Sequence, residues 1–510
     1  MTGTTTHGND LLDQAFTRAA GAARVAGNRI RLLQDGPQNY PAWLDAIGNA
    51  RESVAFENFI FCEDETGRQF AAALMERARA GVKVRLVYDW LGCRGRASRK
   101  FWRALQQAGC DVRVFNPPHA AHPVGWLQRD HRKLLSVDGR VGFISGLCIG
   151  RDWAGDAKSG REPWRDTGVQ IEGPALADIE AAFEQVWAVA GVSLPAALAG
   201  AEPPGPALPP TGTSPAVGDV ALRVVATRPG TYSVLRLDQL IAAAARRTLW
   251  LTDAYFAGIP PFVEALRAAA RDGVDVRLLV PGSSDITLLR PLSQAGYRPL
   301  LEAGVRVFQW QGPMLHAKTA VADGLWARVG SSNLNLASWV GNNELDVLVE
   351  DQRFAADMQD MFEADLARAT ELVLRHERRR LGVVAQDLRS QLKRRRDDWL
   401  SDTHTSHAGQ AAAAALRLSR TVGAALTERR VLATTDARLV GMVGLVALLL
   451  GVGSMLWPQL AAVPIALLLL WGALILFAKA LALRRERRRR GLPTTHVQRD
   501  SRKVERRPQP

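Results

Sequence analysis

The chain has 510 residues, is 47% hydrophobic and 23% charged, and carries a formal net charge of +14. Its length allows two to four domains, and its excess of positive charge indicates an anionic partner, either nucleic acid or an acidic lipid surface. The four cysteines are scattered without a Cys-x-x-Cys pair, so we expect neither a zinc site nor a disulfide framework, and we expect a reducing compartment. Because the first ten residues are polar, we expect no secretory signal peptide.

Apolar periodicity in the first part of the chain predicts strands alternating with helices. This alternation is typical of an α/β layer fold. After a loose tail with a short helix over residues 11–23, we expect strands over residues 29–33, 53–61, 82–88 and 111–115, and helices over residues 39–50, 69–80 and 98–108.

The second part of the chain repeats this order. The stretch TLWLTDAYF at residues 248–256 parallels SVAFENFIF at residues 53–61, and the strands that begin at Gly273 and Gly304 have counterparts after Gly81 and Gly109. A whole α/β domain is therefore duplicated within the chain. The Pro-, Gly-, Ala- and Thr-rich residues 195–215 between the two copies have no periodic pattern and are interpreted as a linker.

Each copy contains the same short motif, His-x-Lys-x4-Asp-Gly. The first runs from His131 and Lys133 to Asp138, and the second from His316 and Lys318 to Asp323. In an extended segment a histidine and the lysine two residues later point to the same face. Two imidazoles and two ammonium groups around one point suit a phosphate ester, because they supply a nucleophile, a proton donor and fixed positive charge.

Residues downstream of the second motif are further candidates. Ser331 and Asn333 could hydrogen-bond a phosphate oxygen or orient the lysine, and Glu344 could fix the tautomer of a histidine. The alternative for Glu344 is an ordinary exposed carboxylate.

The last part of the chain differs in character. After a helix predicted over residues 354–376, basic runs lead to residues 439–478, which contain no charged residue. Since about 20 helical residues cross a bilayer core, this stretch fits two spans that turn at Trp457-Pro458-Gln459. Basic residues flank both spans, which places both flanks on the cytoplasmic side. The alternatives are a buried core hairpin for the apolar stretch and solvated helix faces for the basic runs.

At these motifs the chain resembles the phospholipase D superfamily, and within it the bacterial cardiolipin synthases. The resemblance rests on HRKLLSVDG followed by WRDTGVQIEGP, and on AYF, LHAK and GSSNLNLASWVGNNE in the second copy. It covers roughly residues 28–375. It implies two tandem α/β domains that form a pseudo-dimer with one active site between them.

The resemblance also implies a two-step mechanism that needs no metal and no cofactor. By analogy His131 is the nucleophile that forms a phosphohistidine, and His316 is the acid and base for the leaving and incoming alcohols. Lys133 and Lys318 would bind phosphoryl oxygens. Asp138 and Asp323 complete the two catalytic motifs, with a structural or orienting role favoured for them.

One position departs from the family pattern. After the first motif the family usually has Gly-Gly-x-Asn, whereas this chain has Ser145-Gly146-Leu147-Cys148. A thiol is a weak hydrogen-bond partner, so the first half-site could hold phosphate less firmly or have a different specificity. The alternative is that Cys148 is a small buried residue.

The resulting hypothesis is a membrane-bound phosphatidyltransferase that converts two phosphatidylglycerol molecules into cardiolipin and glycerol. The alternatives are a phospholipase D-type hydrolase, a nuclease, and a catalytically weak membrane scaffold. Because the basic residues gather beside the apolar stretch, an anionic phospholipid is favoured over nucleic acid as partner. The resemblance implies a bacterial inner membrane, and the basic flanks place the catalytic domains in the cytoplasm.

The predicted organisation has seven segments. They are a tail (1–27), a first phospholipase D-like domain (28–192), a linker (193–219), a second such domain (220–375), a basic helical region (376–438), two transmembrane helices (439–478) and a basic cytosolic tail (479–510).

Overall fold

A computed structural model of the chain describes residues 4–118, 128–156, 159–191, 214–283, 285 and 289–374. These residues belong to one compact unit, residues 1–375. The predicted basic region, membrane hairpin and cytosolic tail lie outside the described residues. Within the described part of the chain, no helix has the length and apolar character needed to cross a bilayer.

The first copy folds as an alternation of strands and helices, as its periodicity predicts. Its strands are β1 (Val25–Gln34), β2 (Ser53–Asn58), β3 (Lys83–Asp89), β4 (Asp111–Phe115), β5 (Lys133–Val137), β6 (Val141–Ser145) and β7 (Thr167–Glu172). Its helices are α2 (Asp35–Gly48), α3 (Glu65–Arg79), α4 (Trp90–Cys93), α5 (Arg99–Gln107), α6 (Arg151–Ala154) and α7 (Leu176–Trp187).

The second copy repeats this succession. Its strands are β8 (Val220–Thr227), β9 (Thr248–Thr252), β10 (Asp275–Pro281), β11 (Arg306–Trp310), β12 (Thr319–Ala322), β13 (Trp326–Gly330) and β14 (Glu344–Glu350). Its helices are α9 (Ser233–Ala244), α10 (Pro260–Arg271), α11 (Leu289–Glu302) and α12 (Gln352–Leu366).

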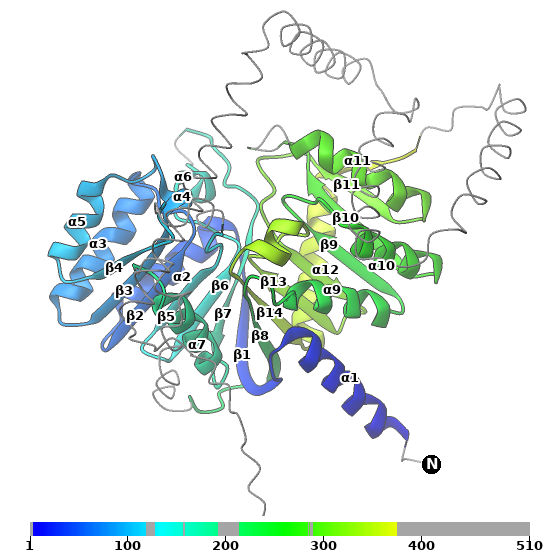
Figure 1. Ribbon diagram of the computed structural model, residues 1–510, viewed down its shortest axis with the longest axis horizontal. Coiled ribbons are helices and arrows are strands. Elements are labelled where there is room, and N and C mark those ends of the chain that lie inside the picture. The colour runs from blue at the N-terminus through cyan, green and yellow to red at the C-terminus, as the bar shows by residue number, and fades with distance from the viewer. Residues whose placement is uncertain are drawn as a thin grey trace, which may run out of the picture. The chain divides into compact units, whose positions relative to one another are not determined.

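The strands of both copies form a single sheet whose order reveals the duplication. From one edge to the other it runs β15-β11-β10-β9-β12-β13-β14-β8-β1-β7-β6-β5-β2-β3-β4, where β15 is Ala369–Leu372. Reading outward from the middle, each strand of the first copy has its counterpart at the same place in the second. The copies join where β1 pairs antiparallel with β8, at Val25 with Leu222 and Asn28 with Val220 (Figure 1).

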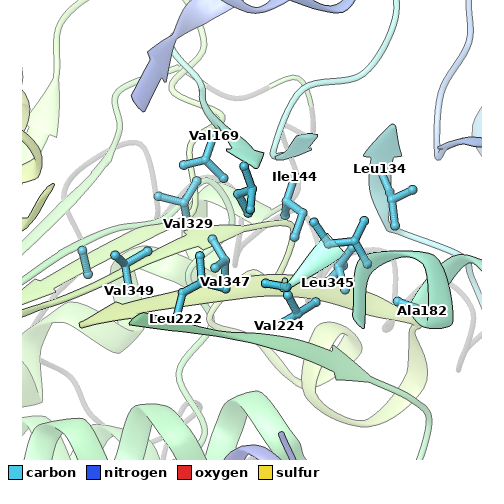
Figure 2. Close-up of a cluster of buried hydrophobic side chains, with 14 of the residues drawn as sticks. Leu134, Ile144, Val169, Ala182, Leu222, Val224, Val329, Leu345, Val347 and Val349 are labelled. Carbon is cyan, nitrogen blue, oxygen red and sulfur yellow. The ribbon is translucent and has the colours of Figure 1, made fainter. Parts of the chain in front are cut away.

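A shared apolar core fixes the two copies against each other. Helices α7 and α12 contribute Phe183 and Phe362 to one cluster that also contains strand residues of both copies. Figure 2 shows Leu134 and Ile144 of the first copy near Leu345 and Val347 of the second. Of two further clusters, one lies beneath helices α2, α3 and α5 of the first copy, and the other lies beneath α9, α10 and α11 of the second. The pairing of the copies is therefore part of the core of the protein.

Local signals explain where several helices begin. The side chains of Asp64, Ser98 and Asp351 accept hydrogen bonds from the first-turn N–H groups of α3, α5 and α12. These residues satisfy backbone donors that have no partner within the helix. Helix α10 begins instead with proline, which lacks the unpaired N–H.

Three predicted boundaries require correction. Strand β1 begins at Val25, inside the segment interpreted as a tail. That segment also contains helix α1 (Thr4–Ala20), whose Phe16 is buried against Trp326 of the second copy. The helix predicted over residues 354–376 ends at Leu366, because the chain turns back there to form the edge strand β15 beside β11.

Asp138 and Asp323 end the two copies of the repeated motif but lie far from the histidines. Strand β5 separates Asp138 from His131, and at about 3.3 Å per residue it carries the aspartate to the opposite end of the sheet. The carboxylate of Asp138 accepts the backbone N–H groups of Arg51, Glu52 and Ser53 at 2.8 Å each. Partial burial alone would raise the pKa of Asp138, but these donors outweigh burial and lower it.

Asp323 repeats this arrangement in the second copy. It accepts the N–H groups of Arg246, Arg247 and Thr248 at 2.8–2.9 Å, and both aspartates have a left-handed φ of 54°. Including Asp138 and Asp323 among the catalytic residues is therefore corrected. Each closes the turn after its motif strand and joins it to the start of the neighbouring strand.

Replacing Asp323 with alanine should destabilise the protein without affecting the chemistry. The change removes three hydrogen bonds to a charged group, so we expect the free energy of unfolding to fall by about 1–3 kcal/mol. Thermal melting measures the loss, and Asp323→Asn is the matched control because asparagine tolerates a positive φ and keeps one acceptor. A folded Asp323→Ala protein that had lost its turnover would contradict the structural role.

Candidate active site

The two motif histidines lie just before equivalent strands, and each is held by the backbone of the opposite copy. His131 precedes β5, and its N–H donates to the carbonyl oxygen of Asn343 at 2.9 Å. His316 precedes β12, and its N–H donates to the carbonyl oxygen of Arg165 at 2.7 Å. Asn343 and Arg165 are equivalent positions that lead into β14 and β7. The duplication therefore places both histidines where the copies meet.

Each imidazole also contacts a carboxylate of the opposite copy. Nδ1 of His131 lies 2.9 Å from Oε2 of Glu344, and Nδ1 of His316 lies 2.7 Å from Oδ2 of Asp166. Both carboxylates are completely buried. Neither histidine has its carboxylate partner within its own copy, so the constellation requires both copies together.

Both carboxylates are ionised in this arrangement. Burial alone would raise the pKa of Glu344, but His131, Lys133 and a hydrogen bond from Ser331 lower it. Burial would likewise raise the pKa of Asp166, but His316 and Lys318 hold it below its usual value. An ionised carboxylate can only accept a hydrogen bond. We therefore assign the proton of each neutral imidazole to Nδ1, which leaves Nε2 as the nitrogen with a free lone pair.

The immediate supports of the two carboxylates differ. The hydroxyl of Ser331 donates to Oε2 of Glu344 at 2.6 Å and accepts from Leu345 N–H at 2.9 Å. At the equivalent position of the first copy stands Gly146, where an added Cβ would lie only 2.1 Å from Oδ1 of Asp166. Trp153 instead donates its indole N–H to Asp166 at 3.1 Å. The glutamate of one pair thus lies beside a serine, and the shorter aspartate of the other pair lies beside a glycine.

The motif lysines are buried beside the histidines. Lys133 and Lys318 are each 1% exposed, and each donates from Nζ to the carbonyl oxygen of its own motif histidine. Burial lowers the pKa of Lys318 to about 8. Asp166 opposes this shift, and the neighbouring ammonium group of Lys133 adds to it. Two buried ammonium groups close enough to repel each other favour an anion between them.

Burial keeps both imidazoles neutral near pH 7. It lowers the pKa of His316 to about 4, with Lys318 acting in the same direction and Asp166 only partly opposing it. It also lowers the pKa of His131, which Glu344 partly offsets. A neutral imidazole is a competent nucleophile. A bound phosphodiester anion would raise both pKa values, which allows one histidine to act as an acid.

Two buried arginines that we did not predict tie this region together. The guanidinium of Arg132 donates to the carbonyl oxygens of Ala182, Thr227 and Glu344, at 2.7–3.4 Å. Arg165 pairs with Asp35 of the first copy at 3.0 Å and with Asp365 of the second at 2.8 Å. Each lies next to a site residue in the sequence, so its anchoring also fixes the backbone of that residue.

The structure brings together most of the predicted site residues. Hydrogen bonds link four of them in one group, which is His131, Lys133, Ser331 and Glu344, and link His316 to Lys318 in a second. The two groups are close enough for Lys133 to lower the pKa of Lys318. Asn333 lies two residues beyond Ser331, with its side-chain oxygen buried and without a hydrogen-bond partner among the described residues. We did not predict Asp166 from the sequence. The duplication contains the signal for it, because Asp166 stands before β7 at the position equivalent to Glu344 at the start of β14.

Cys148 lies at the base of the site, where the apolar core begins. It is 1% exposed and belongs to the cluster that contains Phe61 and Ile149. Burial raises the pKa of its thiol, while Lys133 and Lys318 act in the opposite direction because both are near it. The side chain thus packs as a small apolar residue within electrostatic reach of both lysines.

We expect Cys148→Asn to destabilise the protein, because this largely apolar niche would receive an amide with too few partners. The expected loss is about 1–3 kcal/mol in the free energy of unfolding, with transfer falling in proportion to the folded fraction. Cys148→Ala is the control for the loss of the thiol alone. Equal or faster transfer with an unchanged melting temperature would show instead that asparagine supports the phosphate site, with a gain of at most about tenfold from one hydrogen bond.

Comparison with known proteins agrees with this geometry. The family model described as "Cardiolipin synthase, PLD-like domain" matches residues 43–187 and 237–366. Cardiolipin synthase A of Pseudomonas aeruginosa is 34% identical over 368 residues, which cover 70% of this chain and 71% of that protein. Cardiolipin synthase 1 of Bacillus cereus is 30% identical over 368 residues, with 71% of each chain covered.

Among solved structures, a phosphatidylserine synthase of Haemophilus influenzae has the same fold. It aligns with a TM-score of 0.57 at 13% identity, over 76% of this chain and 99% of that one. The duplicated sheet and its paired histidine–lysine motifs define a phospholipase D-like protein. Within that class, the chain belongs to the cardiolipin synthase family of phospholipase D-like proteins.

Proposed function

We propose that this protein is a cardiolipin synthase that transfers a phosphatidyl group from one phosphatidylglycerol molecule to another and releases glycerol. The observation that carries the proposal is the pair of buried neutral imidazoles, each held at Nδ1 by a carboxylate of the opposite copy. This arrangement offers two Nε2 atoms to one phosphodiester, with two ammonium groups beside it. The relatives named above support cardiolipin as the product.

In the first step, Nε2 of His131 would attack phosphorus and the bond from phosphorus to the glycerol oxygen would break. His316, which takes up a proton at Nε2 when the phosphodiester anion is bound, would give that proton to the glycerol oxygen, and Lys133 and Lys318 would balance the charge on the phosphoryl oxygens. Glu344 would stabilise the positive charge that develops on the His131 ring, because it is ionised and contacts Nδ1 at 2.9 Å.

In the second step, a hydroxyl of another phosphatidylglycerol would attack the phosphohistidine, and Nε2 of His316 would take its proton. His131 then leaves as a neutral imidazole, and the site returns to its starting state. Ser331 fits an orienting role in this scheme because it bonds Glu344, and Asn333 remains a candidate phosphate ligand. A hydrolase would use water in this step, so the product distinguishes the two functions.

We also propose that the protein acts at a membrane through the apolar stretch at residues 439–478. A second feature that fits an anionic bilayer lies among the described residues. Helix α4 follows the end of β3 on the active-site side of the sheet, where Leu91 is 37% exposed and Arg94, Arg96, Arg99 and Lys100 are exposed. No acidic residue lies between positions 90 and 110. Each basic residue near an anionic surface contributes about 1 kcal/mol to binding.

Expression in a cell that lacks its own cardiolipin synthases tests the function. We expect cardiolipin to appear with the native chain, and His131→Ala or His316→Ala to abolish it, because the first change removes the nucleophile and the second removes the acid and base. Tyr88→Phe is the folding and expression control, because its ring stacks on Trp102 and β3 does not border the motif strand β5. With purified protein, chelators should not change transfer, and activity lost to EDTA and recovered with a divalent metal would refute the two-histidine mechanism.

The membrane proposal predicts the location of the C-terminus. Basic residues flank residues 439–478 on both sides, so a reporter fused after Pro510 should be active only on the cytosolic face. A fusion after residue 458, between the expected spans, is the matched control and should report the opposite face. Activity of the Pro510 fusion outside the membrane would overturn the hairpin.

A further inference from the structure

The two halves of the active site have aromatic walls of different polarity. In the first copy, Phe59 lies edge-on to His131, with ring centroids 4.8 Å apart, and Nζ of Lys133 is 5.1 Å from its centroid. In the second copy Tyr255, one position beyond the counterpart of Phe59, makes the matching contacts, 5.9 Å from the His316 ring and 5.8 Å from Nζ of Lys318. Both rings are partly exposed. Only the second wall carries a hydroxyl group.

The position of Tyr255 is fixed at both ends. Its backbone N–H donates to Asp253 at 3.0 Å, and its carbonyl oxygen accepts from the side chain of Asn335 at 3.0 Å. Its hydroxyl donates to Oδ1 of Asp285, an exposed residue, at 2.8 Å. Burial and the nearby carboxylate of Asp285 raise the pKa of Tyr255, so the hydroxyl stays protonated.

We propose that Tyr255 and Asp285 form the subsite that binds the hydroxyl groups of the glycerol headgroup, on the His316 side of the active site. This inference rests on the proposed phosphatidyltransferase function and identifies which residues select the alcohol.

The hydrogen-bonding capacity of the pair fits a polyol. Because the Tyr255 hydroxyl gives its proton to Asp285, its oxygen retains lone pairs that can accept from a ligand hydroxyl. The second oxygen of the Asp285 carboxylate can accept from another. The pair therefore presents neighbouring acceptors next to His316, and glycerol supplies neighbouring donors. The Phe59 wall beside His131 offers no such acceptor.

This asymmetry also separates the roles of the histidines. The acid must be next to the leaving alcohol oxygen, whereas the nucleophile attacks phosphorus from the opposite side. A polyol subsite beside His316 makes His316 the acid and base, and His131 the nucleophile. Tyr255 and Asp285 act as positioning residues, because the proton transfers remain on the imidazoles.

A competition between acceptors tests the subsite independently of the overall rate. Full-length protein is incubated with phosphatidylglycerol vesicles and equal concentrations of isotopically labelled glycerol and ethanol. Mass spectrometry then gives the ratio of labelled phosphatidylglycerol to phosphatidylethanol. We expect Tyr255→Phe to lower this ratio about three- to tenfold, which corresponds to the loss of one hydrogen bond to glycerol but not to ethanol.

Two further variants complete the test. Asp285→Ala changes an exposed side chain and should lower the ratio in the same direction even if Tyr255→Phe folds poorly. Tyr88→Phe removes the hydroxyl of a first-copy tyrosine whose ring stacks on Trp102, and should keep the native ratio. An unchanged ratio in Asp285→Ala or in folded Tyr255→Phe would overturn the subsite while cardiolipin synthesis stood. Native protein that forms only phosphatidic acid would refute the transferase function and the subsite with it.

Discussion

The exchange of carboxylates between the two copies is the constraint on which the rest of the structure depends. His131 is held by Glu344 and His316 by Asp166, so neither copy contains a complete catalytic pair. The continuous sheet through β1 and β8, and the core shared by α7 and α12, hold the copies in the one register that aligns both pairs. A small shift between the copies would misplace both imidazoles at once.

Burial sets the chemical state of this site before any lipid arrives. It removes water from two lysines and two histidines, which lowers the pKa of Lys318 to about 8 and that of His316 to about 4. The site is therefore poised for an anion, because a phosphodiester relieves the repulsion between the ammonium groups and favours a protonated imidazole. Substrate charge thus supplies part of the activation, and the acid forms only when there is a leaving group to protonate.

Much of this could be predicted from the sequence, because duplication converts weak local signals into strong ones. The strand–helix order, the paired motifs and Glu344 follow from periodicity and spacing. The positions of Asp138 and Asp323 were predicted less well, since a motif aspartate can close a turn as readily as it can join in catalysis. Asp166, Arg132 and Arg165 depend on which strands meet across the sheet, and that information lies in long-range packing. The edge strand β15 has no local signature.

The duplicated architecture keeps its geometry while its side chains diverge, which gives the two halves different tasks. Ser331 supports Glu344, whereas glycine at position 146 leaves the space that Asp166 occupies. The buried arginines Arg132 and Arg165 both belong to the first copy. Their counterparts in the second copy are Ala317 and Asn343. The aromatic walls also differ, with Phe59 edge-on to one imidazole and Tyr255, one position further along its copy, edge-on to the other. A symmetric site would accept the alcohol from either side, so this divergence is what gives the two-step transfer a single direction for its leaving and incoming groups.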